Sequence, residues 1–410
     1  MAESRLKIAM LSVHSCPVGN LGAKDTGGMS VYILEIAREL GKKGHLLDIY
    51  TRVHDPSDPQ IVELGQDARL IHLQAGEDEA IHKLALYLHL PDFACNLENF
   101  RKQQNLEYDL VFNHYWLSVW VGQYLKQWWQ VPDINMFHTL GAVKNSFGIR
   151  SDEPDLRIET ERELIRDCHH IIATTEKEKE DLSHYYDAAP DKIGVIPCGV
   201  NLELFHPVDK QAAKQQLGFA DGKTILFVGR IDPLKGLDQL IKAMPYLQNG
   251  LRPRLVIIGG DENSQSEMER LRALSRELKA QDSVAFLGTI KHEQLPDYYN
   301  AADLCVIPSY YESFGLVALE SLACGTPVVA TDVGELKNII RQGETGYVVT
   351  DNTPGLLADK IAQVLFHPGK SLKTPLAIRE SVSRFDWSNI ADAVIEECHL
   401  ALVDYLAPVS

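Results

Sequence analysis

The chain has 410 residues, of which 45% are hydrophobic and 24% charged, and its formal net charge is −17. This length exceeds what one ordinary hydrophobic core accommodates, so two domains are expected. The excess of acidic residues argues against nucleic acid and against an anionic membrane surface as partners, because both attract positive charge.

The seven cysteines are scattered along the chain and never form a C-x-x-C pair. This usage predicts reduced thiols in a cytoplasmic protein, and neither a disulfide framework nor a structural zinc site. The N-terminus lacks the pattern of a signal peptide, and no apolar run approaches the roughly 20 residues of a membrane helix. A soluble, small-molecule partner is therefore expected.

Short apolar segments alternate with amphipathic ones from the N-terminus onward. In the first half this pattern predicts strands at Leu6–Val13, Leu47–Thr51, Arg69–Leu73, Asp109–Asn113, Ile134–His138, His170–Ala173 and Ile193–Ile196. Helical periodicity lies between them, for example at Val31–Lys43, Leu117–Trp128 and Glu159–Asp167. Such an alternation is typical of a parallel sheet covered by helices.

The periodicity stops between Gly199 and Pro207, which predicts a linker. Strands then resume at Thr224–Val228, Leu255–Ile258, Val284–Leu287, Leu304–Ile307, Val328–Thr331 and Tyr347–Val349. A long amphipathic helix, Trp387–Tyr405, has no strand after it. We predict two Rossmann-like, doubly wound α/β domains that face each other across a cleft. The first comprises residues 1–200 with the C-terminal helix 387–410, and the second residues 201–386.

Two cationic side chains follow the first strand of the second half. Arg230 and Lys235 stand in the string Gly-Arg-Ile-Asp-Pro-Leu-Lys-Gly, directly after Thr224–Val228. In a parallel sheet this places them at the carboxyl end of a strand, where ligands bind. Fixed cations there would stabilise the negative charge that grows on a departing diphosphate. A solvated basic pair in a surface loop is the alternative.

Two carboxylates, Glu312 and Glu320, follow the strand Leu304–Ile307 with seven residues between them. The segment between them would open a helix whose free N–H groups suit a phosphate: Ser313, Phe314, Gly315, Leu316 and Val317. Glu312 would accept hydrogen bonds from sugar hydroxyls and Glu320 from ribose hydroxyls. The alternative is an ordinary helix with two exposed acids.

The first half of the chain also contains residues that could contact a ligand, but each of them taken singly indicates a binding site less strongly than the motifs of the second half. Gly27 and Gly28 precede a helix, where paired glycines let a backbone approach a ligand. His14 and His138 each lie at the end of a predicted strand, on the same rim. The phosphate-binding candidates in this acidic half are Lys83, Tyr115, Thr139, Lys144 and Arg157. For each taken singly, a loop, core or surface role is the alternative.

Several catalytic signatures are absent from the sequence. It has no Asp-x-Asp string, by which metal-dependent transferases hold a sugar diphosphate, and no Walker loop or G-x-S-x-G string. We therefore predict no metal site and no cofactor besides a nucleotide sugar as co-substrate. Cations of the protein would hold its diphosphate.

In combination these strings resemble the retaining GT-B glycosyltransferases of family four, over nearly the whole chain from about Lys7 to Leu402. The shared features are E-x7-E, Gly229-Arg230 with Lys235, and Gly27-Gly28. Longer strings resemble the D-inositol-3-phosphate glycosyltransferases of mycothiol biosynthesis: Asp25–Tyr32, Ile49–Arg52, His114–Ser118 and His138–Ser146. Sucrose-phosphate synthases share part of the Gly-Gly and His-x-Leu-Gly strings.

The resemblance implies roles for individual residues. Catalysis would involve His138, Arg230, Lys235 and Glu312. The UDP-sugar would contact Asn20, Leu21, Gly28, Arg230, Lys235, Ile290, Glu312, Ser313, Phe314, Gly315, Leu316, Val317 and Glu320. The acceptor would be lined by His14, Asp25, Thr26, Gly27, Gly28, Met29 and Ser30, and its phosphate held by Lys83, Tyr115, Thr139 and Arg157. The final helix would cross back onto the first domain, and relatives imply a homodimer.

The implied reaction moves N-acetylglucosamine or glucose from UDP to a soluble phosphorylated polyol or sugar, with 1D-myo-inositol 3-phosphate as the first choice. Ser30 and Gly141 depart from the inositol-phosphate enzymes, and Gly141 resembles the sucrose-phosphate synthases. Transfer to fructose 6-phosphate therefore stays open. A UDP-GlcNAc epimerase or a non-catalytic nucleotide-sugar sensor is the alternative of another class.

Overall fold

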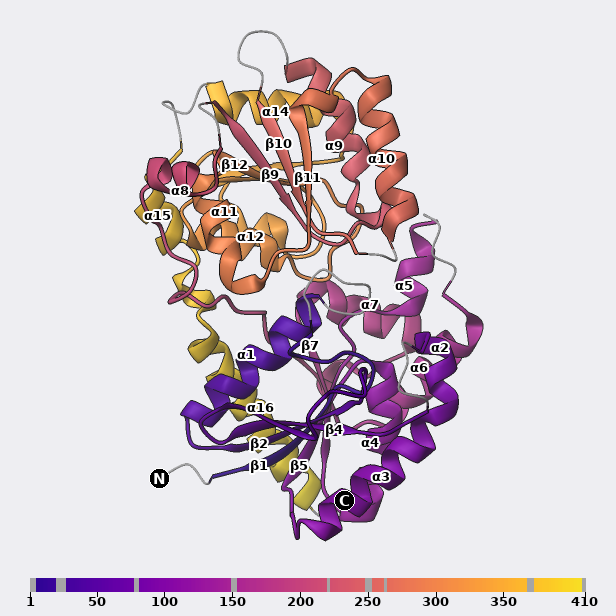
Figure 1. Cartoon of the computed structure of the whole chain (residues 1–410). Helices are drawn as coiled ribbons and strands as arrows, with labels where there is room; N and C mark the ends of the chain where they lie inside the picture. The colour runs from indigo at the N-terminus through magenta and orange to yellow at the C-terminus, as the bar shows by residue number, and fades with distance from the viewer. Residues whose placement is uncertain are drawn as a thin grey trace. The chain divides into compact units, whose positions relative to one another are not determined.

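The computed structural model describes residues 5–19, 27–76, 81–148, 153–219, 222–247, 253–261, 264–366 and 372–407. These residues form two compact units, each with its own sheet (Figure 1). The first unit consists of Gly28–Pro197, the residues up to Gly19 and those from Trp387 onward. The second contains Cys198–Asp386.

The first unit is built on an eight-stranded sheet. Its strands are β1 (Lys7–Leu11), β2 (Leu46–Arg52), β3 (Ile61–Gly65), β4 (Ala68–Leu73), β5 (Leu110–His114), β6 (Asp133–Met136), β7 (His170–Ala173) and β8 (Ile193–Val195). They lie in the order β3-β4-β2-β1-β5-β6-β7-β8. The central strands are almost completely buried, as expected for a sheet covered on both faces.

The prediction of a purely parallel first sheet is wrong at one edge, because β3 pairs with β4 in antiparallel orientation. The turn between them is tight and includes Asp67, whose φ is +54°. Most of β3 is exposed, so its sequence carries no apolar pattern that would have revealed the strand. The strands that the sequence does predict all appear, with ends shifted by at most two residues.

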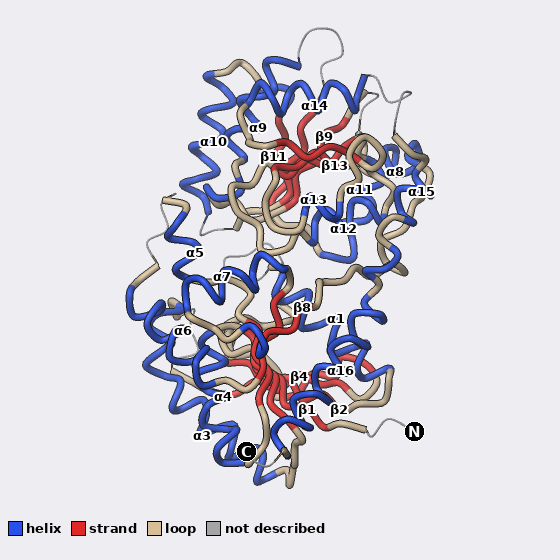
Figure 2. Tube along the Cα trace, turned by 180° about the vertical axis from the view of Figure 1, so that it is seen from behind, coloured by secondary structure: helices blue, strands red, loops and turns tan. Residues whose placement is uncertain are grey.

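Helices cover both faces of the first sheet. They are α1 (Gly28–Lys42), α2 (Lys83–Leu86), α3 (Leu90–Gln103), α4 (Trp116–Trp129), α5 (Gly141–Ser146), α6 (Asp155–Asp167), α7 (Glu176–Tyr186) and α16 (Trp387–Leu406). α1 packs beside α16 on one face, and α3, α4 and α6 lie on the other (Figures 1 and 2). The C-terminal helix thus returns to the first unit, as predicted. Its buried stripe includes Ile390, Val394 and Cys398.

The second unit is built on a six-stranded parallel sheet in the order β11-β10-β9-β12-β13-β14. Its strands are β9 (Thr224–Val228), β10 (Arg254–Ile258), β11 (Val284–Gly288), β12 (Leu304–Ile307), β13 (Val328–Thr331) and β14 (Gly346–Val349). Its helices are α8 (Lys210–Gln216), α9 (Leu237–Ala243), α10 (Gln265–Glu277), α11 (Leu295–Ala301), α12 (Leu316–Ala323), α13 (Leu336–Ile339), α14 (Pro354–Phe366) and α15 (Pro375–Glu380).

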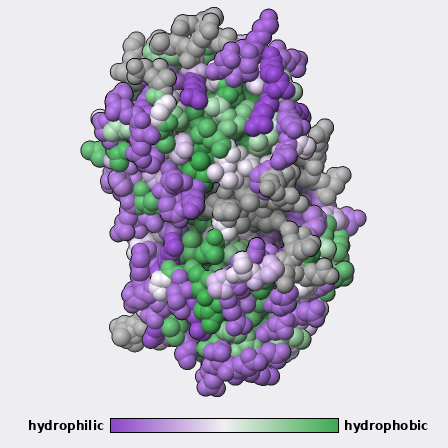
Figure 3. Space-filling model, viewed as in Figure 1, coloured by the Kyte–Doolittle hydropathy of each residue, from purple (hydrophilic) through white to green (hydrophobic). Residues whose placement is uncertain are grey.

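These helices also form two layers, with α9, α10 and α14 on one face of the sheet and α8, α11, α12 and α15 on the other (Figure 1). The first layer closes the core, where Leu240, Leu271 and Ile361 pack on strand residues. On the face shown in Figure 3, most of the residues along the outer edges of each unit are hydrophilic. Among the described helices, none has both the length and the apolarity to cross a bilayer.

Candidate functional site

In the second unit, the predicted cations and carboxylates lie at the carboxyl ends of two neighbouring strands. Arg230 and Lys235 follow β9, and Glu312 follows β12, which pairs with β9. The two loops touch directly, because Tyr310 donates its backbone N–H to the carbonyl of Leu234 at 2.8 Å. Residues far apart in the sequence thus share one rim.

Lys235 and Glu312 are bonded to each other. Lys235 Nζ donates to Glu312 Oε1 at 2.7 Å, and Ser309 Oγ donates to the same oxygen at 2.7 Å. Arg230 is half-buried, and no carboxylate of the described residues lies within ion-pair distance of it. The rim therefore holds one paired cation and one guanidinium available to an anion.

The helix after Glu312 begins later than predicted. α12 starts at Leu316, with Gly315 as its N-cap and Ser313 and Phe314 in the preceding loop. Gly315 has φ +119°, and a Cβ there would lie 2.6 Å from Leu336 Cδ2, so only glycine fits. No side chain caps this terminus, which leaves the N–H groups of Leu316 and Val317 for a ligand.

Glu320 lies inside α12 and is buried. Its two oxygens face two donors: His292 Nε2 at 2.8 Å from Oε1, and Tyr299 Oη at 2.7 Å from Oε2. Ile290, predicted near the uracil, is half-buried and follows the edge strand β11. Whether Glu320 and Ile290 contact the nucleoside stays a prediction.

Most of the described residues that were predicted to bind the acceptor lie in the first unit, whereas Gly27 is grouped with the second. The predicted acceptor residues Asp25 and Thr26 and the predicted donor contacts Asn20 and Leu21 fall outside the described residues. Gly28 and Met29 begin α1, directly after Gly27. Ser30 is buried, and its Oγ lies 2.9 Å from Ser15 Oγ. Ser30 thus faces the protein interior.

Three neighbouring strands, β1, β5 and β6, end at a common rim in the first unit. His14 follows β1, Tyr115 follows β5, and Thr139 follows β6. The rings of His14 and Tyr115 lie 4.2 Å apart, and Tyr115 donates its N–H to the carbonyl of Met136 at 2.8 Å. Tyr115 has φ +76°. Such backbone strain in a non-glycine residue clusters at functional sites.

His138 lies just beyond the strand that was predicted to contain it, with φ +60°. Its Nε2 is 3.0 Å from Nδ1 of the buried His114, and the ring of Tyr32 packs against both. Burial lowers the pKa of His138 to about 3 and that of His114 well below its usual value. Both imidazoles are therefore neutral, and His138 can donate or accept one hydrogen bond.

A cluster of cations lies beside Tyr115. Arg157 on α6 is completely buried, and its guanidinium carbon lies 5.0 Å from the centre of the Tyr115 ring. Arg157 Nη2 donates to the carbonyl of Thr139 at 2.7 Å and to Thr139 Oγ1 at 3.2 Å. Glu161 accepts from Arg157 Nε at 2.7 Å and also binds the Gly141 N–H. The guanidinium is thereby held in one orientation.

Two lysines join Arg157 around a carboxylate that the sequence did not single out, Glu153. Lys144 Nζ lies 2.7 Å and Lys83 Nζ 3.7 Å from Glu153 Oε1, while Arg157 Nη1 lies 2.9 Å from Oε2. Although burial opposes ionisation, Arg157 and Lys144 lower the pKa of Glu153 to about 2. The structure thus gathers the predicted phosphate candidates Lys83, Tyr115, Thr139, Lys144 and Arg157.

The structure adds residues to these sites that the sequence analysis did not name. Some of them stand in a recognisable sequence pattern, and others do not. Glu153 stands four residues before Arg157, a spacing that favours ion pairs near a helix start. His114 ends a strand just as His14 and His138 follow theirs. His292 and Tyr299 had no such signal, since only the packing of α11 against α12 brings them to Glu320.

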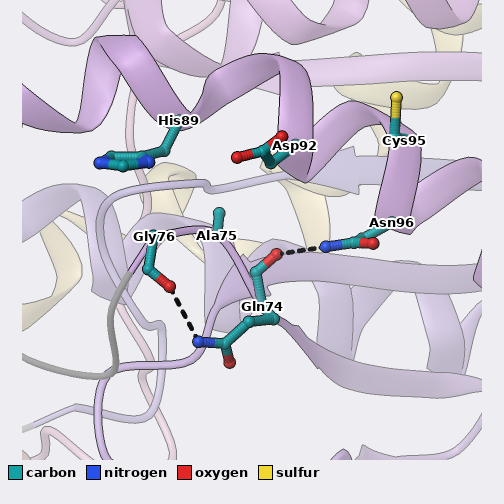
Figure 4. Close-up of a pocket in the computed structure, with 7 residues that line it drawn as sticks. All are labelled: Gln74, Ala75, Gly76, His89, Asp92, Cys95 and Asn96. Carbon is teal, nitrogen blue, oxygen red and sulfur yellow. Dashed lines mark hydrogen bonds between the residues drawn. The ribbon is translucent and has the colours of Figure 1, made fainter.

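A hollow of about 390 Å³ lies elsewhere in the first unit (Figure 4). Its lining combines the chain after β4 with the start of α3: Gln74, Ala75, Gly76, His89, Asp92, Cys95 and Asn96. Asn96 Nδ2 donates to the Gln74 carbonyl at 2.8 Å, which ties the two sides together. The lining includes no lysine or arginine and none of the predicted site residues, so it does not suit a phosphate.

Family models and known proteins resemble this chain in both units. The model "Glycosyltransferase Family 4" matches residues 26–204, and "Glycosyl transferases group 1" matches residues 209–380. A D-inositol 3-phosphate glycosyltransferase of Corynebacterium glutamicum is 37% identical over 395 residues, covering 94% of each chain.

Solved structures of glycosyltransferases also resemble this chain. A sucrose-phosphate synthase from Thermosynechococcus elongatus has a TM-score of 0.88 and 34% identity, covering 98% of this chain and 100% of that one. Anabaena Alr3699/HepE, solved with UDP and glucose, has a TM-score of 0.76 at 19% identity, covering 96% and 100%, and shows the fold alone. The chain belongs to family 4 of the glycosyltransferases, enzymes of the GT-B fold.

Proposed function

We propose that this glycosyltransferase moves a hexosyl group from a UDP-sugar to a soluble phosphorylated acceptor, with 1D-myo-inositol 3-phosphate as the first choice. The observation that carries the proposal is the buried Arg157. Arg157 Nη1 lies 2.9 Å from Glu153 Oε2, and Lys83 and Lys144 stand at the same carboxylate, so three cations gather in one place. Such a cluster suits a phosphate, whose oxygens accept charge-assisted hydrogen bonds from lysine and arginine.

The donor half of the proposal rests on the second unit. Arg230, Lys235 and the start of α12 would hold the diphosphate, with Glu312 accepting from hydroxyls of the hexose and Glu320 from the ribose. The neutral His138 in the first unit suits a hydrogen bond to a hexose hydroxyl. The proposal includes retention of the anomeric configuration, with the leaving diphosphate accepting the proton of the acceptor hydroxyl.

Fructose 6-phosphate is the second candidate acceptor, because the sucrose-phosphate synthase matches 98% of this chain at 34% identity. Both candidates present a phosphate to the same cations. They differ in the ring that carries the attacking hydroxyl, which the phosphate contacts do not distinguish.

A product assay tests the proposal. The purified protein is incubated with UDP-N-acetylglucosamine or UDP-glucose and with either phosphorylated acceptor, and the products are weighed by mass spectrometry and their anomeric configuration read by NMR. We expect a glycosylated inositol phosphate, formed equally well with EDTA present. A sucrose phosphate product would select the second acceptor.

Other outcomes contradict the proposal. Consumption of the UDP-sugar without any acceptor would indicate an epimerase, and binding without turnover on either acceptor would indicate a sensor. Activity that EDTA abolishes and manganese restores would show that a metal, and not Arg230 and Lys235, neutralises the diphosphate.

A further inference from the structure

Two side chains of one helical segment of the second unit bind Glu320. His292 begins the short helix η7 (His292–Gln294), which continues directly into α11, where Tyr299 lies seven residues further on. Residues at this spacing lie on the same face of a helix. Their polar atoms reach different oxygens of one carboxylate: His292 Nε2 lies 2.8 Å from Glu320 Oε1, and Tyr299 Oη donates to Oε2 at 2.7 Å.

The Glu320 carboxylate depends on these two donors. Its side chain is only 8% exposed, and among the described residues His292 is the one basic side chain within ion-pair distance of it. Burying a carboxylate is costly unless hydrogen bonds replace those of the lost water. Since an ionised carboxylate can only accept hydrogen bonds, Nε2 is the nitrogen of His292 that carries the proton.

The two hydrogen bonds leave half of the acceptor capacity of the carboxylate for a ligand. An ionised carboxylate has about four acceptor sites, two on each oxygen. His292 and Tyr299 each occupy one site, and they do so on different oxygens. One site therefore remains on each oxygen of Glu320. A ribose presents two neighbouring hydroxyl groups, which match this arrangement.

Phe205 holds both donors in place. The ring of this buried phenylalanine lies 5.1 Å from that of His292 and 5.9 Å from that of Tyr299, measured between ring centres. Tyr299 is itself completely buried. The backbone carbonyl of Phe205 accepts a hydrogen bond from Arg379 Nη1, which fixes the phenylalanine. The imidazole and the phenol thus have little freedom to turn away from Glu320.

We infer that His292 and Tyr299 are positioning residues for nucleoside recognition: they hold the Glu320 carboxylate so that its two remaining acceptor sites receive the two ribose hydroxyls. The inference rests on the UDP-sugar proposed above and on the predicted ribose contact of Glu320. His292 also ends the loop after β11 that contains Ile290, the residue predicted near the uracil. One hydrogen bond thus links the segment for the base to the carboxylate for the ribose.

Calorimetric titration with UDP and with 2′,3′-dideoxy-UDP tests the inference, because the second ligand lacks only the two ribose hydroxyls. We expect the unaltered enzyme to bind UDP about a hundredfold more tightly than the dideoxy ligand, since two hydrogen bonds to a charged acceptor are at stake. In His292→Leu the affinity for UDP should fall about tenfold while that for the dideoxy ligand stays the same, so the ratio shrinks to about ten.

His206→Leu is the matched control for this variant. His206 is an exposed histidine of the same unit, and its Nδ1 lies 2.9 Å from the carbonyl of Glu203, away from the carboxylate of Glu320. Both affinities of this control should equal those of the unaltered enzyme. His292→Gln keeps an N–H donor on a side chain of similar length, so its ratio should return toward a hundred.

Tyr299→Phe is the second variant, and it carries the test if His292→Leu does not fold. It removes one hydroxyl and keeps the packing of the ring, so its ratio should also shrink to about ten. Tyr298→Phe is the control here, because Tyr298 is the neighbour of Tyr299 on α11 and its ring contacts Phe219. We expect that control to keep the ratio of the unaltered enzyme.

The outcomes separate the inference from the proposed function. If the unaltered enzyme does not bind UDP, the proposed donor is wrong, and the inference falls with it. If it binds UDP and the dideoxy ligand equally well, Glu320 does not receive the ribose hydroxyls. If His292→Leu and Tyr299→Phe weaken both ligands by the same factor, the two residues only support the fold. In the last two cases the inference is wrong while the UDP donor stands.

Discussion

Lys235 and Glu312 bond to each other in this structure, at 2.7 Å, although each is expected to bind a different part of the UDP-sugar. Their side chains are 19% and 16% exposed, so the pair is partly shielded from water. Removing either partner leaves the other without its counter-charge, which affects the free enzyme as well as the transition state. The effects of the two residues on binding and turnover are therefore coupled.

We predict that Lys235→Ala and Glu312→Ala each lower turnover by about two to three orders of magnitude, because fixed charges aimed at the departing diphosphate and the hexose are lost. The double variant should lose much less than the product of the two single losses, since the residues are coupled. Steady-state kinetics on the three variants measure this.

Lys242→Ala is a suitable control for this pair, because Lys242 lies nearby on α9 and pairs with Asp238 at 2.9 Å, outside the rim. Its turnover should match that of the unaltered enzyme. Near-normal rates in both Lys235→Ala and Glu312→Ala would remove the argument for donor binding at this rim.

At the scale of elements, α16 is fixed to the first sheet by a histidine on β7. His170 Nδ1 lies 3.1 Å from Glu397 and its Nε2 3.1 Å from Asp404, one and three turns along the helix from its buried Val394. Gly194 on β8 makes room, because a Cβ there would lie 2.8 Å from Glu397 Oε2. The hydrogen bond that His170 donates to Glu397 is the main cause that raises the pKa of His170.

Because the folded protein raises this pKa, the stabilisation is complete below the unfolded value near 6.5 and is lost as the pH rises through the folded value. We predict that His170→Gln lowers the free energy of unfolding of the first unit by about 1 kcal/mol at pH 5.5 and by much less at pH 9. Denaturant titration at the two pH values measures the difference.

Asp392→Asn provides the comparison for His170. Asp392 joins α16 to Lys43 at 2.6 Å in an ion pair that involves no histidine. The small effect of Asp392→Asn on the free energy of unfolding should be the same at pH 5.5 and at pH 9. An equal effect of His170→Gln at pH 5.5 and pH 9 would show that the charge of His170 contributes nothing.

At the scale of the whole molecule, each unit has its own sheet and its own core, so the chain need not unfold in a single step. The described residues that we predict to bind the donor belong to the second unit, with the exception of Gly28. His138, which we predict to take part in catalysis, belongs to the first unit. A ligand that binds only the folded form of one unit stabilises that unit.

We therefore predict that UDP at 100 times its dissociation constant stabilises the second unit by about 2.7 kcal/mol. Differential scanning calorimetry should show one transition that moves upward with UDP and another that moves little, and Lys235→Ala should weaken the shift. If only the transition of the first unit moved, UDP binding would belong there.

The sequence alone determined the alternation of strands and helices, because a buried parallel strand needs a short apolar run and a covering helix needs a 3.6-residue period, and both are local patterns. It also placed Arg230, Lys235 and Glu312 directly after strands, which puts them on a rim of the sheet whatever the remaining packing. The family resemblance came from the same local strings.

The tertiary structure decided how side chains from distant segments meet. Glu153 with Lys83, His292 with Glu320, and His170 with α16 join segments separated by 28 to 234 residues. No local pattern encodes such pairs, because their distances depend on how helices pack on the sheet. The exposed β3 was missed for a related reason: its pairing with β4, and not an apolar pattern of its own, makes it a strand.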